Sequence, residues 1–184
     1  MKLIIVRHGQ TCSNADGIIQ GQTNSQLSEL GKEQAKKLKE RLKDEKIDFI
    51  FSSDLDRARH TAEEVASIFR MKVNTTKLLR ERSFGNLEGR KRSDFEGQDF
   101  YTFSTCEQNE SIMKRARDFL DSIQKYNNKI ILVVGHGGIN IALISNLLGK
   151  SFKEAVEMGR HHNTGVSIFE DGKMICFNCT KHLE

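Results

Sequence analysis

Two short stretches of this sequence hold residues whose types could do chemistry. Arg7-His8-Gly9 directly follows the apolar run Lys2–Val6, and Gly135-His136-Gly137-Gly138 directly follows the apolar run Lys129–Val134. Each stretch places an imidazole beside glycines, which let a ligand approach the backbone. The second stretch opens a helical pattern, and the free N–H groups at a helix start favour an anion. Either histidine alone fits a turn residue, but two such stretches, one with an adjacent arginine, indicate a shared anion-binding pocket.

The elements that position these stretches follow from hydrophobic spacing. Strands are predicted at Lys2–Val6, Asp48–Ser52, Lys72–Thr75 and Lys129–Val134, with two further strands around Asp171-Gly172, and helices at Ser28–Leu42, Asp54–Phe69, Ser111–Tyr126, Gly137–Leu148 and Phe152–Met158. Continuous apolar strands that alternate with helices indicate an α/β fold, a three-layer sandwich with a mostly parallel central sheet flanked by helices. Ligands of such sheets bind at the carboxyl ends of the strands, where both histidines come.

Helical spacing also predicts inner faces and caps. The expected assignments are Leu30, Gln34 or Ala35, Leu38 and Leu42 on the inner face of the first helix, Asp54 or Ser53 as the cap of the second, and Ser111 as the cap of the third. A capping side chain satisfies backbone N–H groups that the helix itself cannot, so these positions bear on where each helix begins.

Length and composition bound the class of protein. The chain has 184 residues with 29 basic and 25 acidic side chains, a formal charge of +4, and 37% hydrophobic residues. One domain over residues 1–184 is expected, and nearly balanced charges argue against a disordered chain. The apolar runs are too short for a membrane span, and no signal peptide is apparent. We therefore expect a cytoplasmic protein with no membrane or nucleic-acid partner, since +4 is no basic tail.

Other signatures in the sequence are incomplete. Neither the last glycine of a dinucleotide fingerprint nor a phosphate-binding Gly-x-x-x-x-Gly-Lys-Ser/Thr loop is present. Cys176-x-x-Cys179-x-x-His182 has metal-like spacing but lacks a fourth ligand, so a pair of reduced thiols is the better interpretation than zinc. Cys12 lies close enough to His8 in sequence to face the pocket and to make it sensitive to oxidation.

Six stretches, in order along the chain, carry a resemblance to a known family. They are Arg7-His8-Gly9-Gln10-Thr11-x-x-Asn14, Leu27-Ser28-Glu29-Leu30-Gly31-x-x-Gln34-Ala35, Ser52-Ser53-Asp54-Leu55-x-Arg57-Ala58-x-x-Thr61-Ala62, Leu79 to Gly89 with Glu81, Glu110-Ser111 with Arg117, and Gly135-His136-Gly137-Gly138. Together they resemble the histidine phosphatase superfamily, the phosphoglycerate mutase-like proteins. Any one stretch would be weak support, whereas six in the family's order are specific.

The resemblance implies phosphoryl transfer through a phosphohistidine, with no metal or other cofactor. His8 would attack phosphorus and must be neutral at the attacking nitrogen, with its other ring nitrogen held by an acceptor. Arg7 and Arg57 would bind phosphoryl oxygens bidentately, and His136 would add a donor if protonated. Glu81 would protonate the leaving oxygen and then accept a proton from water. The remaining phosphate contacts would come from Asn14, Gly21 and Gly137.

Some of these assignments have an alternative. Glu81 could instead form an ion pair with Arg80 or Arg82, which share its charged run. Glu88 competes with Glu81 as the acid, although a structural role is favoured. Asn14 could equally cap a turn.

The length of one segment distinguishes a hydrolase from a mutase in this family. Cofactor-dependent mutases of this family carry a long insertion after the acid loop that closes the site against water, whereas only a short insert at about residues 90–109 follows it here. Gln10-Thr11 also departs from the Glu-Ser that is usual in the mutases. We expect a phosphomonoester hydrolase for a small phosphorylated metabolite. A phosphoglycerate mutase or a non-catalytic phosphate-ester binding module is the alternative.

The insert is expected to be a lid over the substrate. Its basic cluster Arg90-Lys91-Arg92 could hold a second phosphate. Phe95, Phe100, Tyr101 and Phe103 would either line an apolar wall or pin the insert to the core. A sugar bisphosphate, phosphoglycerate, an α-ribazole phosphate, phosphoserine and a broad range of phosphomonoesters remain open as substrates, as does a monomeric or dimeric state.

Overall fold

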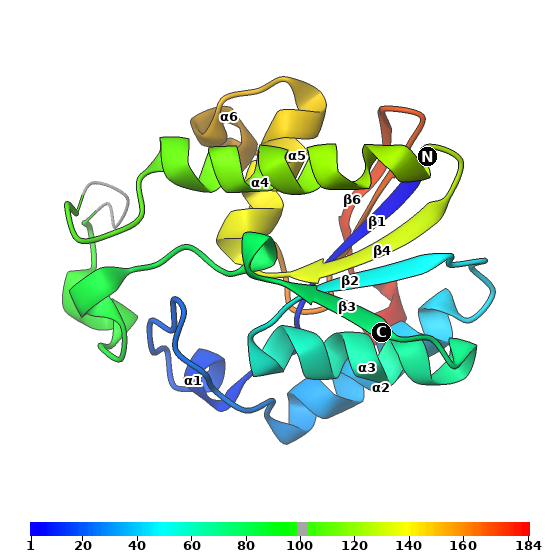
Figure 1. The fold of residues 1–184 in the computed structure, drawn as a ribbon. Helices are drawn as coiled ribbons and strands as arrows, with labels where there is room; N and C mark the ends of the chain where they lie inside the picture. The colour runs from blue at the N-terminus through cyan, green and yellow to red at the C-terminus, as the bar shows by residue number, and fades with distance from the viewer. Residues whose placement is uncertain (99–102) are drawn as a thin grey trace.

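A single mixed sheet organises the chain in a computed structural model, which describes residues 1–98 and 103–184 (Figure 1). The strands are β1 (Lys2–Arg7), β2 (Phe49–Ser53), β3 (Val73–Thr76), β4 (Ile130–Gly135), β5 (Val166–Glu170) and β6 (Lys173–Cys179), in the order β3-β2-β4-β1-β5-β6. The first four strands in this order are mutually parallel. Strand β5 pairs antiparallel with β1, and β6 pairs antiparallel with β5. The mostly parallel sheet is confirmed.

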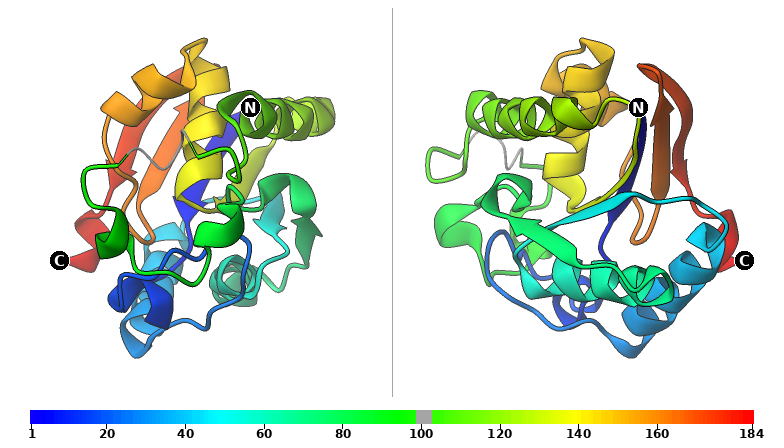
Figure 2. Two further views of the ribbon diagram at one scale, coloured as in Figure 1. Left: turned by 90° about the vertical axis from the view of Figure 1, so that its left-hand side faces the viewer. Right: turned by 45° about the vertical axis from the view of Figure 1, so that its right-hand side comes forward.

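Helices cover both faces of the sheet (Figures 1 and 2). Those of the described residues are α1 (Cys12–Ala15), α2 (Glu29–Leu42), α3 (Asp56–Phe69), α4 (Asn109–Ile123), α5 (Gly137–Leu148) and α6 (Phe152–Glu157), with 3₁₀ turns at Lys77–Leu79, Gly85–Leu87, Arg92–Phe95, Gln124–Tyr126 and Lys181–Leu183. Helices α2 and α3 pack on one face, and α4, α5 and α6 pack on the other. The three-layer α/β sandwich is therefore confirmed.

The central strand β1 shows why the apolar runs are continuous. Leu3 and Ile5 belong to the core under α4 and α5, whereas Ile4 and Val6 belong to the core over α2 and α3. Successive side chains of a strand point to opposite faces, so a strand covered on both faces is apolar at every position. Each of these buried side chains contributes roughly 2 kcal/mol through the hydrophobic effect.

The inner face of α2 is confirmed at Ala35, Leu38 and Leu42, but Gly31 and not Leu30 begins it. Leu30 is 54% exposed, whereas Gly31 and Ala35 are buried against the core. A Cβ on Gly31 would lie 1.9 Å from the carbonyl oxygen of Gln10, so only glycine allows this close approach of the chain. Gln34 binds the same residue, because its Oε1 accepts from the Gln10 N–H at 2.8 Å. The helix is therefore docked on the segment that follows His8.

Two predicted caps are wrong, and each has a competing partner. Helix α3 begins at Asp56 with Leu55 in the cap position, because the Asp54 carboxylate accepts two hydrogen bonds from Arg80 at 2.7 Å. Helix α4 begins at Asn109, two residues before Ser111, whose hydroxyl donates instead to Glu107 at 3.0 Å. A tertiary partner outweighs local capping at Asp54, and a local one does so at Ser111.

The described part of the insert is fixed by aromatic packing. Phe95 is 7% exposed and packs edge-to-face on Phe103 with ring centroids 5.9 Å apart, in a small cluster with Ile19 and Leu87. These two aromatic residues pin the insert rather than form a wall. The predicted contributions of Phe100 and Tyr101 lie outside the described residues.

No helix within residues 1–98 and 103–184 combines the length and apolar character that crossing a membrane requires.

Candidate active site

The two histidine stretches meet because their strands are neighbours. Strands β1 and β4 pair in parallel with Arg7 opposite Gly135, so His8 and His136 occupy equivalent positions just beyond the strand ends. The His8 N–H donates to the Gly135 carbonyl oxygen at 3.0 Å. The two imidazole centroids are 5.0 Å apart, and both side chains are buried.

The His8 ring is held in one tautomer. Its Nδ1 lies 2.7 Å from the Gly9 carbonyl oxygen, which can only accept, so Nδ1 carries the proton and Nε2 keeps a lone pair. Burial lowers the pKa of His8 well below 6.5, and the nearby charges of Arg57 and Arg7 lower it further. His8 is therefore a neutral imidazole with a nucleophilic Nε2.

The second histidine is held by Arg57. The Arg57 Nε donates to His136 Nδ1 at 3.2 Å, so the proton of a neutral His136 ring is on Nε2. Burial, followed by the charge of Arg57, lowers the pKa of His136 well below 6.5. The protonated state considered from the sequence does not fit this environment. His136 instead presents one neutral N–H donor, whose Nε2 has no partner among the described residues.

Arg57 itself is positioned by backbone carbonyls. Its Nη1 and Nη2 each donate at 2.7 Å, to Thr23 and Gly21 respectively, and the side chain is buried. Together with the His136 contact this uses three of the five guanidinium N–H groups and leaves two for a ligand. Burial lowers its pKa from 12.5 to about 10, which keeps the group cationic at neutral pH.

Arg7 has more donors to spare. Its Nη1 donates to the His161 carbonyl oxygen at 2.6 Å, while its buried Nε has no partner among the described residues. Burial lowers the pKa of Arg7 from 12.5 to about 10, so it too stays charged at neutral pH. An unpartnered buried N–H is costly, and a ligand oxygen would satisfy it.

Glu81 reaches the site from the loop between β3 and α4. Its carboxylate accepts from the Gly138 N–H at 2.9 and 3.2 Å, at the start of α5, and from its neighbour Arg82 N–H at 2.8 Å. The alternative ion pairs do not describe it, because Arg80 binds Asp54 and Arg82 directs its guanidinium to Glu107 and Asn109. Glu81 is thus held by backbone donors.

The loop that carries Glu81 is held by Arg115 and not by Arg117. Arg115 donates to the carbonyl oxygens of Leu78, Arg80 and Glu81 at 2.9 to 3.3 Å and pairs with Glu107 at 2.7 Å. Arg117 is exposed on α4, and its Nε donates to Asn146 Oδ1 on α5 at 3.3 Å. Arg115 and Arg117 are two residues apart and therefore lie on nearly opposite sides of the helix, and it is Arg115 that faces the Glu81 loop.

Glu88 holds loops together, as the sequence favoured. Its Oε1 accepts from the Gln22 N–H at 3.1 Å and the Phe84 N–H at 3.0 Å. It also abuts Gly21, where a Cβ would lie 2.0 Å from the same oxygen and where φ is +52°. Gly21 thus brings its carbonyl to Arg57 in a conformation and a space that suit glycine alone.

Two adjoining cavities open at this edge of the sheet. The histidine cavity, of about 270 Å³, has Arg7, His8, Asn14, Gly21, Arg57 and Glu81 in its lining. The adjoining cavity, of about 280 Å³, has Gly137, Gly138, Ile141, Val156, Arg160 and His161 in its lining. Arg7, Glu81, Phe84, Arg92 and Arg160 line both, so the two form one continuous site. All the predicted site residues except His136 line one cavity or the other, and His136 is fully buried next to His8.

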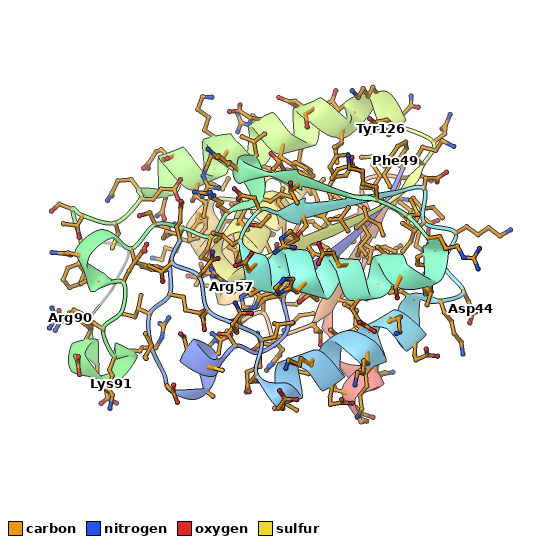
Figure 3. All side chains as sticks on the ribbon, turned by 60° about the horizontal axis from the view of Figure 1, so that its bottom comes forward. Asp44, Phe49, Arg57, Arg90, Lys91 and Tyr126 are labelled. Atoms are coloured by element: carbon orange, nitrogen blue, oxygen red, sulfur yellow. The ribbon has the colours of Figure 1, made fainter. Side chains whose placement is uncertain are left out.

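Asn14 and Arg92 line the site, whereas other residues of the basic cluster lie outside it. Asn14 forms a capping box with Thr11 at α1 and also lines the histidine cavity. Of the basic cluster, Arg92 lines both cavities, whereas Arg90 stacks on the Phe95 ring at 4.6 Å. Figure 3 shows Arg90 and Lys91 at the outer edge of the molecule, away from Arg57.

Arg160, His161 and Asn163 were missed by sequence reasoning. They precede β5, which runs antiparallel to β1, so the start of β5 lies at the carboxyl end of β1. The Asn163 side chain donates to the His8 carbonyl oxygen at 2.9 Å. Recognising the last two strands as an antiparallel hairpin beside β1 would have pointed to this polar run.

The cysteines lie apart from this chemistry. Cys12 is exposed at the start of α1 and is not among the described residues that line either cavity. Cys176 and Cys179 are unbridged on β6, where the Cys176 thiol lies 3.6 Å from the Val166 carbonyl oxygen. Within the described part of the chain, no cluster of His, Cys, Asp and Glu could hold a metal ion.

A family model described as the histidine phosphatase superfamily (branch 1) matches residues 3–174, and the chain belongs to this superfamily. It is 31% identical to a metal-independent phosphoserine phosphatase of Arabidopsis thaliana, over 91% of this chain and 75% of that protein. It is 34% identical to the adenosylcobalamin/alpha-ribazole phosphatase of Escherichia coli K12, over 81% of this chain and 80% of that protein.

A solved structure extends the comparison to the whole chain. The phosphoserine phosphatase of Entamoeba histolytica in complex with 3-phosphoglyceric acid superposes with a TM-score of 0.87 at 30% identity, covering 100% of this chain and 99% of that one. A histidine-to-alanine mutant of that enzyme in complex with phosphoserine gives a TM-score of 0.86 at 29% identity, again covering 100% of this chain and 99% of that one. With the family, these relatives identify the chain as a phosphoric monoester hydrolase.

Proposed function

We propose that this protein hydrolyses a small phosphorylated metabolite through a phosphohistidine formed on His8. One observation carries the proposal: the His8 ring is buried and neutral, its Nδ1–H is donated to Gly9, and its Nε2 is free to attack. The two buried arginine cations beside it complement a phosphoryl group. Phosphoryl transfer needs mainly positioning and electrostatic stabilisation, which these groups supply.

In the first step, His8 Nε2 bonds to phosphorus while the bond from phosphorus to the leaving oxygen breaks. Arg7, with its unpartnered Nε, and the two remaining N–H groups of Arg57 bind the equatorial oxygens. The Nε2–H of His136 donates to a third oxygen as a neutral group. Protonated Glu81 gives its proton to the leaving oxygen, and the alcohol departs.

In the second step, water attacks the phosphohistidine. Glu81, now ionised, removes a proton from the water as its oxygen bonds to phosphorus and the P–N bond breaks. Inorganic phosphate forms, and His8 Nε2 regains its lone pair. The Gly138 N–H donates to the Glu81 carboxylate and holds it in position for both steps.

We further propose that residues 1–184 act as one domain with the insert at about residues 90–109 as its lid, in the cytoplasm. The pinning of Phe95 against Ile19 and Leu87 keeps the described part of the insert beside the histidine cavity. Mutase chemistry requires water to be excluded from the phosphoenzyme, and this short insert favours hydrolysis. Asn14, Gly21 and Gly137 remain proposed phosphate contacts.

Turnover of a phosphomonoester panel in the presence of a chelator tests the function. The native protein and His60→Ala, a change on α3 outside the site, are expected to release phosphate, and His8→Ala is expected to lose this activity. Rapid quenching of the native enzyme should trap an acid-labile, base-stable phosphoryl bond. Undiminished turnover by His8→Ala, or strict metal dependence, contradicts the mechanism, and transfer of phosphate to a second alcohol would favour the mutase.

A further inference from the structure

The adjoining cavity lies where the leaving group of the substrate must go. In an in-line transfer, the leaving oxygen points away from the attacking His8 Nε2 and toward the acid Glu81. Glu81 lines both cavities, whereas His8 is not among the described residues that line the adjoining one. The part of the substrate beyond the leaving oxygen therefore enters the adjoining cavity, an assignment that rests on the proposed function.

This cavity carries an excess of positive charge. Arg7, Arg92 and Arg160 are in its lining, and Glu81 is the single carboxylate among its described lining residues. Arg7 already serves the phosphoryl group, and Glu81 is occupied by the Gly138 N–H. Arg160 favours a second negative charge on the substrate, because a cation in the lining of a cleft concentrates the field inside it.

Arg160 is the cation most open to a ligand. Its side chain is exposed at the rim of both cavities, and its guanidinium makes no hydrogen bond or ion pair with any residue described by the structure. Its charge lowers the pKa of Arg7, which places it within electrostatic reach of the phosphoryl site. Five N–H donors in a planar fork suit a carboxylate or a phosphate.

His161 adds a buried polar group to the same cavity. The residue is 1% exposed, and neither ring nitrogen has a partner within the described part of the chain. Its ring stands edge-on to Phe177 at 5.1 Å, and its carbonyl oxygen binds Arg7. An unpartnered buried imidazole that lines a cavity offers a hydrogen bond that a ligand can complete.

We propose that the substrate carries a second anionic group on its leaving alcohol, and that Arg160 and His161 are the residues that select it. Arg160 pairs with the anion, and His161 donates one hydrogen bond beside it. Ile141 and Val156 provide an apolar wall for a short carbon chain between the two anions. The substrate class is thus a compact phosphomonoester with a carboxylate or a second phosphate.

Matched substrate pairs test this selection. 3-Phosphoglycerate and glycerol 3-phosphate differ by a carboxylate against a hydroxymethyl group, and fructose 1,6-bisphosphate and fructose 6-phosphate differ by one phosphate. We expect kcat/KM to be at least about 10-fold higher for the member of one pair that carries the second anionic group, because a hydrogen bond to a charged group stabilises binding by this factor or more. The pair that shows the preference identifies the anion as carboxylate or phosphate.

Variants then assign the preference to residues. Arg160→Gln is expected to lower kcat/KM for the substrate with the second anionic group by about 10- to 100-fold. It should change kcat/KM for the pair member that lacks this group by less than about 3-fold. Arg160→Lys should restore part of the preference, and His161→Asn should weaken it without abolishing turnover of p-nitrophenyl phosphate. Lys153→Gln removes an exposed cation from α6 and should leave both pairs as in the native enzyme.

The outcomes separate the two proposals. If neither p-nitrophenyl phosphate nor any panel member is hydrolysed, the proposed function fails. If p-nitrophenyl phosphate and both pairs are hydrolysed without an anionic preference, or if Arg160→Gln lowers all substrates equally, the selection by Arg160 and His161 is overturned. A preference that Lys153→Gln reduces as much as Arg160→Gln would show general surface charge and contradict the proposal.

Discussion

The Arg57 Nε donates to His136 Nδ1 at 3.2 Å, and this contact determines the state of the second histidine. A donor on Nδ1 places the proton of a neutral ring on Nε2, and the adjacent positive charge disfavours a second proton. The same guanidinium is bound to the carbonyl oxygens of Gly21 and Thr23. The arginine that we propose to bind phosphate thus also orients a neutral donor.

Arg57→Lys tests this double role. A lysine ammonium cannot reach two carbonyl oxygens and an imidazole with the planar geometry of a guanidinium. We expect kcat to fall by about 100- to 1000-fold, as for loss of a transition-state donor. Arg59→Lys is the matched control, because Arg59 lies on the same helix and pairs at the surface with Asp56 and Glu63. Near-native kcat for Arg57→Lys would contradict the assignment.

Gly138→Ala is expected to displace the acid. A Cβ at this position would lie 2.6 Å from Glu81 Oε1, so the carboxylate must move, whereas a Cβ on Gly137 would lie at an ordinary 3.6 Å from Oε2. Gly138→Ala should lower kcat/KM for alkyl phosphates by about 100-fold or more, and Gly137→Ala should lower it less. For p-nitrophenyl phosphate, whose leaving group needs little protonation, the loss on kcat/KM should be smaller. Equal losses on both substrate types would contradict the role of Glu81.

The acid side of the activity profile follows from His8. Because burial and two arginines depress its pKa well below 6.5, the ring stays neutral as the pH falls through 6.5. We therefore expect kcat/KM, corrected for ionisation of the substrate, to show no one-proton decline centred near pH 6.5. Steady-state rates between pH 5 and pH 8 measure this, and a His8-dependent limb near 6.5 would refute it.

Buried neutral histidines also make stability depend on pH. Burial lowers the pKa of His161 from 6.5 to about 4. The unfolded chain therefore binds an additional proton between these values, and stability is full above pH 6.5 and declines as the pH falls toward 4. The free energy of unfolding should fall by roughly 1 kcal/mol per pH unit for each such group.

Urea unfolding at pH 7 and pH 5.5 measures this slope. His161→Gln should reduce the slope by about one proton. An unaltered slope in His161→Gln would show that His161 does not stay neutral in the folded protein.

Much of the architecture was predictable because local pattern and global fold agree. Continuous apolar strands such as Ile130–Gly135 indicate burial on both faces of the sheet. The start of the helix Gly137–Leu148 is marked in the sequence by the two glycines that follow His136. The cap at Asp54 was not predictable, because its side chain binds Arg80, which is 26 residues away along the chain. At Ser111 the helix already begins two residues earlier, and the hydroxyl binds Glu107 in the loop before it. Propensity gives a local preference, and tertiary contacts override it.

The sequence by itself determined the chemical types at the site: two strand-end histidines, two arginines and an acid in a charged loop. Only the tertiary structure decided their protonation states, their tautomers and their neighbours. The reason is that a pKa depends on burial and nearby charge, and a tautomer depends on the hydrogen-bond partner. It placed Arg115 rather than Arg117 behind Glu81, and it brought Arg160 and His161 to the carboxyl end of β1. Because β5 pairs antiparallel with β1, the first residues of β5 lie beside the last residues of β1. Local sequence patterns do not show which strands pair.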